Sequence, residues 1–273
     1  MAADALTADR GAILLGLRDG ALTRRVLASG GAQADFVETG GPLAATAVGL
    51  VGVPRVLVHN AVWNWSLAHP DALDVPGVLA TMRAALERTG TPWHSVHLGF
   101  AAAAVGAEGP MMVPRSPVLP RESLRAAIAE TARRVAGALP VPLLLENLDY
   151  WPSGAYEHVA DPAFIAEVLE EAGAGFLLDL AHARVAAAHL GMPIDEYLAR
   201  LPLARVRELH VSGPRLRDGV LRDAHASLGD DDYRLLALVR RAARPGAVTF
   251  EYGGTDAGAV AAELGRLRTA LAA

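Results

Sequence analysis

Short apolar runs alternate along the chain with longer segments that repeat with a helical period. The runs are bounded by turn-forming residues and are rich in β-branched and large apolar side chains, which is typical of buried parallel strands. We predict eight strands, at residues 12–17, 34–39, 55–59, 94–100, 141–147, 175–180, 205–211 and 247–253. The longer segments predict helices at 75–90, 120–139, 161–175, 193–201, 230–244 and 256–273.

The order of these elements indicates the fold class. Eight strands that are mostly separated by helices are typical of an α/β protein whose parallel sheet closes into a (β/α)8 TIM barrel. A doubly wound open sheet is the alternative, but the turn after the first strand, GLRDGAL, does not match the dinucleotide motif G-x-G-x-x-G. No linker or low-complexity segment divides the chain, so we predict a single TIM-barrel domain over residues 1–273.

Ligand-type residues gather at the carboxyl ends of the predicted strands. From the third strand to the eighth, each strand places one such residue at or near its end: His59, His97, Glu146, Asp179, His210 and Glu251. His182 follows Asp179 by three positions, and Asp223 and His225 lie in the loop after His210. Because these strand ends open onto one face of a barrel, we expect five imidazoles and four carboxylates to converge there.

Such a cluster favours divalent cations. Four carboxylates packed together repel one another, and their pKa values rise unless a cation neutralises them. Imidazole with carboxylate suits zinc, iron or manganese, and nine ligands at roughly three to four per ion imply two or three ions. Closely spaced ions need a bridging carboxylate, a role that Glu146 or Glu251 fits. The joint pattern carries this prediction, because an isolated histidine at a strand end is more often structural.

The other four histidines fall in loops or away from the strand ends. We interpret them as solvated or structural residues, and one of them, His94, is also a candidate to support a ligand. They are His69, His94, His158 and His189.

Composition narrows the chemistry further. The chain has no cysteine, and all 25 of its basic residues are arginine. Cysteine nucleophiles, Cys-ligated metals, lysine Schiff bases and P-loop lysines are therefore excluded. The net charge of −5 offers no basic surface for nucleic acid. No apolar run approaches the roughly 18 residues of a membrane span, and the polar, acidic N-terminus is unlike a secretory signal, so we expect a cytoplasmic protein.

The chain resembles the multinuclear non-haem iron-dependent oxidases, the family that includes the methanobactin-biosynthesis oxidase. The resemblance runs from LGLR to TFEYGG and is densest from 143 to 225. LLLENLDYW is similar to the family's ENxxxY segment, and LRDAHASL is similar to its D-x-H turn. The most specific part is the stretch from GFLLDL to RELHVSGP, which is similar to the family's Y-L-x-x-L-P spacer and V-x-E-I-H-L-x-G strand.

This resemblance implies a xylose-isomerase-like barrel and a multinuclear iron site. It further implies the use of dioxygen to oxidise a side chain, often cysteine, of a ribosomally made precursor peptide, and a partner protein that recognises the leader of that peptide. Many members have asparagine where this chain has His182. A third imidazole strengthens binding at that centre or favours zinc over iron, so the metal stays open between iron, zinc and manganese.

The chain is also similar to endonuclease IV, a three-zinc enzyme that acts on abasic sites in DNA. The ligand order of that enzyme is His, His, Glu, Asp-x-x-His, His, Asp-x-His, Glu, and this sequence supplies all nine in order. Shared geometry implies a first centre at His59, His97 and Glu146, and a second at Glu146, Asp179, His210 and Glu251. It implies a third centre at His182, Asp223 and His225.

Three functions compete for this site. The oxidase interpretation accounts for the spacer and strand motifs. An abasic-site phosphodiesterase needs a grip on DNA, for which a chain of net charge −5 is poorly suited, and salt-dependent binding to abasic DNA separates the two. A metal-dependent sugar isomerase of the same superfamily shares part of the ligand set. A scaffold without chemistry predicts broken ligands, whereas all nine candidates are present.

Residues near the expected ligands form a weaker second set. Asn60, Asn147 and Glu38 are candidates to hydrogen-bond and orient the ligands. Candidates for substrate contact lie in loops after the ligand strands, although each of them alone is more readily explained as an ordinary loop residue. They are Trp63, Tyr150, Trp151, Ser212 and Arg215.

Overall fold

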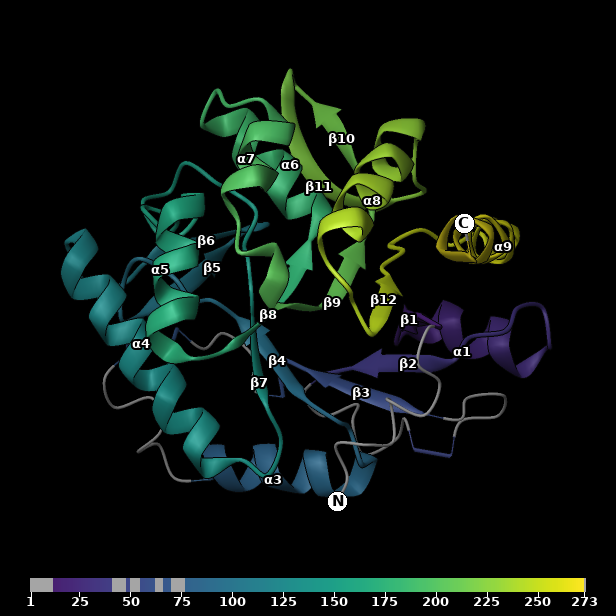
Figure 1. Ribbon diagram of the computed structural model, residues 1–273, viewed down its shortest axis with the longest axis horizontal. Coiled ribbons are helices and arrows are strands. Elements are labelled where there is room, and N and C mark those ends of the chain that lie inside the picture. The colour runs from purple at the N-terminus through teal and green to yellow at the C-terminus, as the bar shows by residue number, and fades with distance from the viewer. Residues whose placement is uncertain (1–11, 41–47, 50–54, 62–65, 70–76, 273) are drawn as a thin grey trace.

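Eight parallel strands close into a barrel in the computed structural model, which describes residues 12–40, 48–49, 55–61, 66–69 and 77–272 (Figure 1). The strands are β1 (Leu14–Arg18), β2 (Phe36–Thr39), β3 (Val56–His59), β4 (His94–His97), β7 (Leu143–Glu146), β8 (Gly175–Asp179), β9 (Val206–Val211) and β12 (Ala247–Phe250). β1 pairs with both β2 and β12, which closes the sheet. Each predicted strand overlaps one of them, so the TIM barrel is confirmed and the open sheet is excluded.

Helices surround the barrel on its outside (Figure 1). They are α1 (Ala21–Ala28), α3 (Val78–Thr89), α4 (Arg121–Ala138), α5 (Pro162–Ala172), α6 (Leu180–His189), α7 (Ile194–Arg200), α8 (Asp230–Ala242) and α9 (Ala257–Ala272), with a 3₁₀ turn at Leu203–Arg205. The six predicted helices are present, although residues 75–76 of the first lie outside the described part of the chain. Within the described residues, no helix is long and apolar enough to cross a membrane.

Two helices were not predicted from the sequence. α6 follows β8 directly, and seven of its ten residues are buried, so it lacks the one-sided apolar pattern by which a surface helix is recognised. α1 is only eight residues long and carries Arg24 and Arg25 in its middle. The prediction therefore missed α6 because of its burial and α1 because of its short length.

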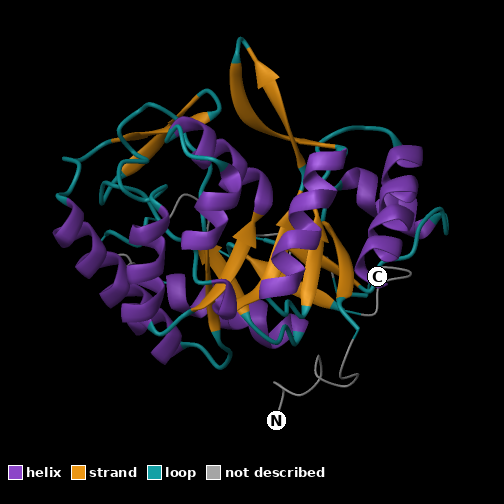
Figure 2. Cartoon of the chain, turned by 45° about the horizontal axis from the view of Figure 1, so that its top comes forward, coloured by secondary structure: helices purple, strands orange, loops and turns teal. Residues whose placement is uncertain are grey.

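Two antiparallel hairpins stand at the same end of the barrel (Figure 2). The first pairs β5 (Val105–Glu108) with β6 (Met111–Pro114), and the second pairs β10 (Gly213–Arg217) with β11 (Val220–Ala226). The prediction that Arg215, Asp223 and His225 lie in loops is therefore wrong, because all three lie on strands of the second hairpin. Its turn is Asp218-Gly219 with φ of 52° and 76°, a pair typical of tight hairpins.

Large side chains fill the barrel interior below the strand ends. Phe36, Leu57 and Ala247 form a buried cluster with Leu14 and Trp93 packed against it. Because strand side chains alternate, residues two positions further along β2 and β3 point the same way, toward the mouth of the barrel. Gly16 on β1 leaves room for the Phe36 ring, since a Cβ added at Gly16 would lie 2.3 Å from that ring.

Replacing Gly16 with alanine should therefore destabilise the barrel. We expect Gly16→Ala to lower the free energy of unfolding by about 1–3 kcal/mol, the usual cost of overpacking a core. Gly137→Ala is the matched control, because Gly137 lies on the exposed side of α4 with nothing near its added Cβ, and alanine there should be neutral or slightly stabilising. Urea denaturation of both variants measures the difference, and equal stabilities would contradict the packing argument.

Candidate metal centre

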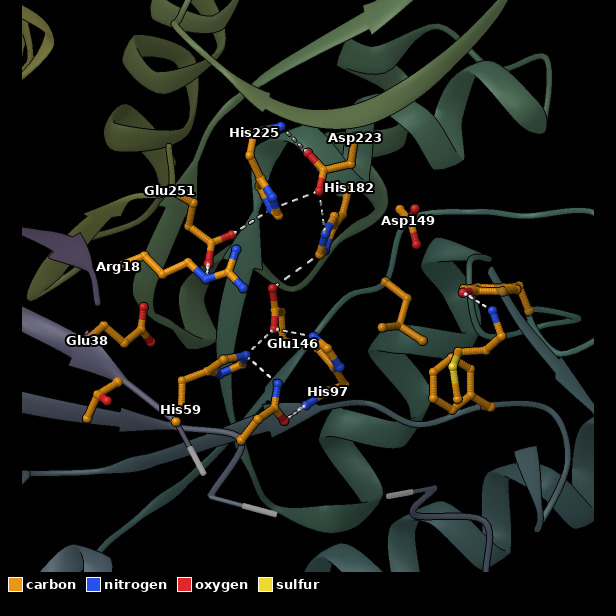
Figure 3. Close-up of a pocket in the computed structure, with 17 residues that line it drawn as sticks. Arg18, Glu38, His59, His97, Glu146, Asp149, His182, Asp223, His225 and Glu251 are labelled. Atoms are coloured by element: carbon orange, nitrogen blue, oxygen red, sulfur yellow. Dashed lines mark hydrogen bonds and ion pairs between the residues drawn. The ribbon is translucent and has the colours of Figure 1, made fainter. Parts of the chain in front are cut away.

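The barrel brings the predicted ligand residues to one end, and Figure 3 shows those of them that line the cavity there. Four of them are the last residues of their strands: His59 of β3, His97 of β4, Glu146 of β7 and Asp179 of β8. His210 is the next-to-last residue of β9, and Glu251 directly follows β12. Parallel strands in register place these positions side by side, as the pairing of His97 with Glu146 and of Asp179 with His210 shows.

Glu146 lies at the middle of the cluster and is almost completely buried, with 1% of its surface exposed. Its Oε2 is 3.1 Å from His59 Nε2 and 3.3 Å from His97 Nε2. Its Oε1 is 3.4 Å from His210 Nδ1 and 3.5 Å from His182 Nδ1. The two oxygens of one carboxylate therefore face different imidazoles, which is the arrangement that a bridging ligand requires.

A second group surrounds His210. Its Nδ1 lies 4.0 Å from Asp179 Oδ2 and 3.8 Å from Glu251 Oε2. Ligand atoms of Asp179, His210 and Glu251 all lie within 4.8 Å of one another, as do those of His59, His97 and Glu146. Two neighbouring sets of three or more ligand-type atoms are thus present, with Glu146 between them.

Asp179 also positions His182. Its side chain caps α6 by accepting a hydrogen bond of 2.7 Å from the His182 backbone N–H. The His182 ring donates from Nδ1 to the Asn147 carbonyl at 2.8 Å, so Nε2 is the nitrogen left to bind an ion, and it lies 3.6 Å from Asp223 Oδ2. Asp223 Oδ2 is also 2.9 Å from His225 Nε2.

β11 presents Asp223 and His225 from the second hairpin. His225 has a φ of 43°, unusual for a residue that is not glycine, and its Nε2 lies 3.1 Å from Glu251 Oε2. Gly253 makes this approach possible, since its N–H donates to the His225 carbonyl at 2.7 Å and an added Cβ would lie 3.1 Å from the His225 Cβ. The hairpin therefore completes the third group by close backbone contact with the chain after β12.

The three residues expected to orient ligands contact the cluster. Glu38 Oε2 lies 2.8 Å from His210 Nε2, the ring nitrogen that faces away from Glu146. The Asn147 side chain joins β7 to β8 through two hydrogen bonds of 2.9 Å with the Asp179 backbone. Asn60 contacts His59 Nε2 and accepts a bond from the His97 N–H. Ser95, which was not predicted, lies 2.9 Å from His59 Nδ1 through its Oγ.

The residues expected to contact substrate lie around the cluster rather than in it. Tyr150 stacks on His189, and Trp151 lies beneath the Arg222 guanidinium. Ser212 donates to Asp223 Oδ1 at 3.1 Å, and Arg215 donates to carbonyls of its own hairpin and the following loop. Trp63 lies outside the described residues. Buried His94 contacts the Val58 carbonyl at 3.1 Å, in keeping with a structural role.

A cavity of about 320 Å³ opens above the cluster (Figure 3). Besides the candidate ligands, it is lined by residues that the sequence analysis did not select, among them Arg18, Phe100, Met112, Leu148, Asp149 and Tyr156. Arg18 was open to prediction, because it ends β1 just as His59 ends β3, and its Nε lies 3.6 Å from Glu251 Oε1. The four apolar residues have no such signal, since apolar side chains in loops and hairpins resemble core residues in a sequence. Asp149 lies three residues after the end of β7, where a carboxylate is also common in an ordinary loop.

Electrostatic coupling holds the cluster in an unusual protonation pattern. Burial opposes ionisation of Glu146, but the charges of His59, His97 and His210 outweigh it and hold the Glu146 pKa well below its usual value. Burial raises the pKa of Asp179 to about 7. Burial lowers the pKa of His225, but its bonds to Asp223 and Glu251 outweigh burial and raise that pKa to about 10. The metal-free cluster thus carries protons at positions that metal ligands must give up.

This pattern predicts how stability depends on pH. In the metal-free protein, folded His225 keeps its proton to about pH 10, whereas unfolded histidine loses it near 6.5. The folded state binds more protons in this range, so the free energy of unfolding should fall from pH 7 to 10, by about 1.4 kcal/mol per pH unit for each proton lost. Bound metal displaces these protons from the folded state, and unfolded histidine is already neutral above pH 7, so the slope should largely disappear in the metal-loaded protein. Urea denaturation of chelated and metal-loaded protein at several pH values tests this, and parallel slopes would contradict it.

The donor set fits metal ions. Glu146 Oε2, Asp179 Oδ2 and His210 Nδ1 are buried and have no hydrogen-bond partner among the described residues. Buried polar atoms without partners are costly, and cations in the first and second groups would satisfy them, with Glu146 Oε2 in the first group and Asp179 Oδ2 and His210 Nδ1 in the second. Imidazole nitrogens with carboxylate oxygens suit iron, zinc and manganese.

Comparison with protein families gives a match over most of the chain. A family model described as "RiPP precursor modification enzyme MbnB/TglH/ChrH" matches residues 35–271. A UPF0276 protein of Chromobacterium violaceum is 30% identical over 217 residues, which cover 74% of this chain and 75% of the relative. UPF0276 proteins of Bordetella parapertussis (34% identical over 48% of this chain) and Streptomyces avermitilis (29% over 55%) match across only 48% and 31% of their own lengths.

Solved structures share the fold at low sequence identity. A D-tagatose 3-epimerase-like protein has a TM-score of 0.65 and 12% identity, with 94% of this chain and 97% of that one covered. The IOLI protein with a bound zinc atom has a TM-score of 0.61 and 12% identity, with 94% and 96% covered. A xylose isomerase domain protein of Planctomyces limnophilus has a TM-score of 0.57 and 12% identity, with 96% and 95% covered. The fold is therefore a xylose-isomerase-like TIM barrel.

Proposed function

The chain belongs to the MbnB/TglH/ChrH family of RiPP precursor modification enzymes, and from this premise we propose that it is a multinuclear non-haem iron-dependent oxidase. Its substrate would be a ribosomally synthesised precursor peptide, and the modified group a cysteine side chain. A partner protein that recognises the leader of the peptide would complete the system. The observation that carries the proposal is the placement of Glu146, whose two oxygens face imidazoles from different elements.

Two or three ions would be held by the groups described above. His59, His97 and Glu146 would bind the first ion, and Glu146, Asp179, His210 and Glu251 the second. His182, Asp223 and His225 would bind the third. Iron, when bound, would supply the redox chemistry with dioxygen that no side chain of this chain can supply.

The protein's own residues prepare the site for that chemistry. Ser95 and Glu38 hold the far ring nitrogens of His59 and His210, which fixes the ring orientation. Asn147 does the same for His182 through its carbonyl. The chain has no cysteine, so any thiolate at this site must come from the substrate, and thiolate is a ligand that iron accepts well.

Metal content and peptide modification together test the proposal. Protein purified without oxygen should contain two or three irons per chain, and with dioxygen it should change the mass of a cysteine-containing precursor peptide encoded nearby. Peptide in which serine replaces cysteine is the control and should stay unchanged. Stoichiometric zinc together with nicking of abasic-site DNA would overturn the oxidase in favour of a phosphodiesterase.

His182 offers a test of the ion count. His182→Asn removes an imidazole from the third group only, because His182 Nε2 faces Asp223 while the first and second groups keep all their own members. We expect the variant to lose about one ion per chain and to retain the other two, since each site needs at least three ligands. Metal analysis after gel filtration measures the ratio. Loss of all ions, or of none, would show that the groups are not separate in this way.

A further inference from the structure

The cavity at the barrel mouth has two chemically different walls (Figure 3). One wall consists of the candidate ligands and Arg18. The other is apolar and consists of Phe100, Met112, Leu148 and Tyr156. These four come from the connection after β4, from β6 and from the segment after β7, so the first hairpin and the 147–156 segment build this wall together.

Contacts between these segments make the apolar wall a preformed surface. The Phe100 and Tyr156 rings meet edge to face with centroids 5.5 Å apart. The Tyr156 hydroxyl accepts a hydrogen bond of 3.3 Å from the Met112 N–H, and the Ala101 N–H donates to the Ala155 carbonyl at 2.7 Å. A wall that is already fixed costs little ordering entropy when it binds a ligand.

Asp149 lies on the lining between the two walls. Its Oδ2 accepts a bond of 2.8 Å from Trp151 Nε1, while its Oδ1 takes part in no hydrogen bond within the described residues. The Arg222 guanidinium lies 3.9 Å from the Trp151 ring centroid and donates to the Tyr150 carbonyl, so β11 holds Trp151 in place. A half-buried carboxylate with one free oxygen is a ready acceptor for an N–H donor in the cavity.

The size of the cavity limits what it binds. A volume of about 320 Å³ is at the small end of ligand pockets, which range over roughly 300–1,000 Å³. The cavity therefore has room for the side chain at the metal cluster and for little more than one neighbour. An acidic neighbour would be disfavoured, because the cavity already carries the carboxylates of Asp149 and the cluster.

On the basis of the proposed function, we propose that this half of the cavity binds the peptide residue that adjoins the modified cysteine. The apolar wall takes an uncharged, apolar side chain of that residue, and Asp149 Oδ1 accepts its backbone N–H. Asp149 is thus a positioning residue for the main chain, and the apolar wall sets the side-chain preference of the substrate.

Three short peptides test the side-chain preference. Acetyl-Leu-Cys-Leu-amide, acetyl-Gly-Cys-Gly-amide and acetyl-Asp-Cys-Asp-amide are titrated into iron-loaded protein without oxygen, and binding is measured by calorimetry. Burial of one leucine side chain should make the leucine peptide bind at least about tenfold more tightly than the glycine peptide. The aspartate peptide should bind most weakly.

A charge swap in the wall should invert this order. Met112→Arg places a cation in the apolar wall without touching a candidate ligand, so the metal content should be unchanged and the aspartate peptide should now bind more tightly than the leucine peptide. Leu216→Arg is the matched control, because Leu216 is 72% exposed at the tip of the second hairpin and outside the cavity. It should leave the preference of the wild-type protein unchanged.

Asp149→Ala tests the main-chain contact. It should weaken the leucine and glycine peptides by a similar factor, about tenfold for a hydrogen bond to a charged group, because the backbone N–H is common to them. The aspartate peptide should lose less, because Asp149→Ala also removes the repulsion between the two carboxylates. Methylating both leucine nitrogens of the leucine peptide should weaken its binding to the wild-type protein and have little effect in Asp149→Ala. A structural role for Asp149 would not produce this dependence on the N-methyl group.

The outcomes separate this inference from the proposed function. If the leucine and aspartate peptides bind the wild-type protein within twofold of each other, or if Met112→Arg leaves their order unchanged, the apolar subsite is overturned while the oxidase proposal stands. If N-methylation weakens binding equally with and without Asp149, the main-chain contact is overturned. If no cysteine peptide binds and no precursor is modified, the proposed function fails and this inference fails with it.

Discussion

Glu146→Gln should abolish most of the metal binding and most of the activity. The side chain lies within 3.5 Å of imidazole nitrogens on both of its oxygens, and glutamine offers only one oxygen as a ligand. Loss of a ligand's supporting partner already costs about 10–100-fold in metal affinity or activity, so loss of the shared bridge should cost more than about 100-fold in turnover. The first two ions should be lost together.

Metal analysis and mass spectrometry of the peptide product measure this effect. Glu130→Gln is the matched control, because Glu130 is exposed on α4 and, among the residues that the structure describes, forms an ion pair only with Arg133 on the same helix. Exposed pairs of this kind contribute little to stability, so the control should behave as the wild-type protein does. A Glu146→Gln variant that keeps the wild-type ratio of metal to protein would show that this carboxylate does not bridge two ions.

Glu38→Gln should weaken one metal group selectively. The Glu38 carboxylate lies 2.8 Å from His210 Nε2, and a proton held between them leaves the His210 Nδ1 lone pair facing Glu146, Asp179 and Glu251. Glutamine is a weaker acceptor and orients the ring less firmly. We expect the affinity for the second ion to fall by about 10–100-fold. The first ion should be retained, because the carboxylate of Glu38 lies against His210 of the second group.

Titration of metal into the protein in the presence of a competing chelator measures the affinity for each ion. Asp195→Asn serves as the control, because Asp195 lies on α7 and pairs with Arg234 at the surface. An unchanged affinity in Glu38→Gln, or an equal loss of the first ion, would show that Glu38 does not act through His210.

The strands and the residues at their ends were predictable because both signals lie within a few neighbouring positions of the sequence. A short apolar run ending in His59 or Asp179 carries both the signal for a buried strand and the position of its ligand-type residue. In a closed parallel barrel the carboxyl ends meet at one face, so the convergence of six elements follows from topology alone. The same reasoning also reaches Arg18, the last residue of β1, and Glu38, the next-to-last residue of β2.

The second hairpin and α6 were harder to predict. Asp223 and His225 are separated by one residue on β11, but nothing in the sequence indicates that the hairpin folds back until Gly253 meets His225. Most residues of α6 are buried, so its sequence has no continuous polar face to reveal it. In both cases contacts between distant segments decide the local structure, and a pattern read along the chain does not contain them.

The sequence by itself determined the barrel, the order of its strands and the identity of the residues at the strand ends, because hydrophobic periodicity and strand polarity are properties of neighbouring positions. Only the tertiary structure decided that the two oxygens of Glu146 face different imidazoles, that Glu38 lies against His210, and that an apolar wall stands opposite the cluster. That wall joins Phe100, Met112, Leu148 and Tyr156 from separate loops and strands. Their proximity depends on how the chain packs, and packing is set by long-range contacts that no local pattern encodes.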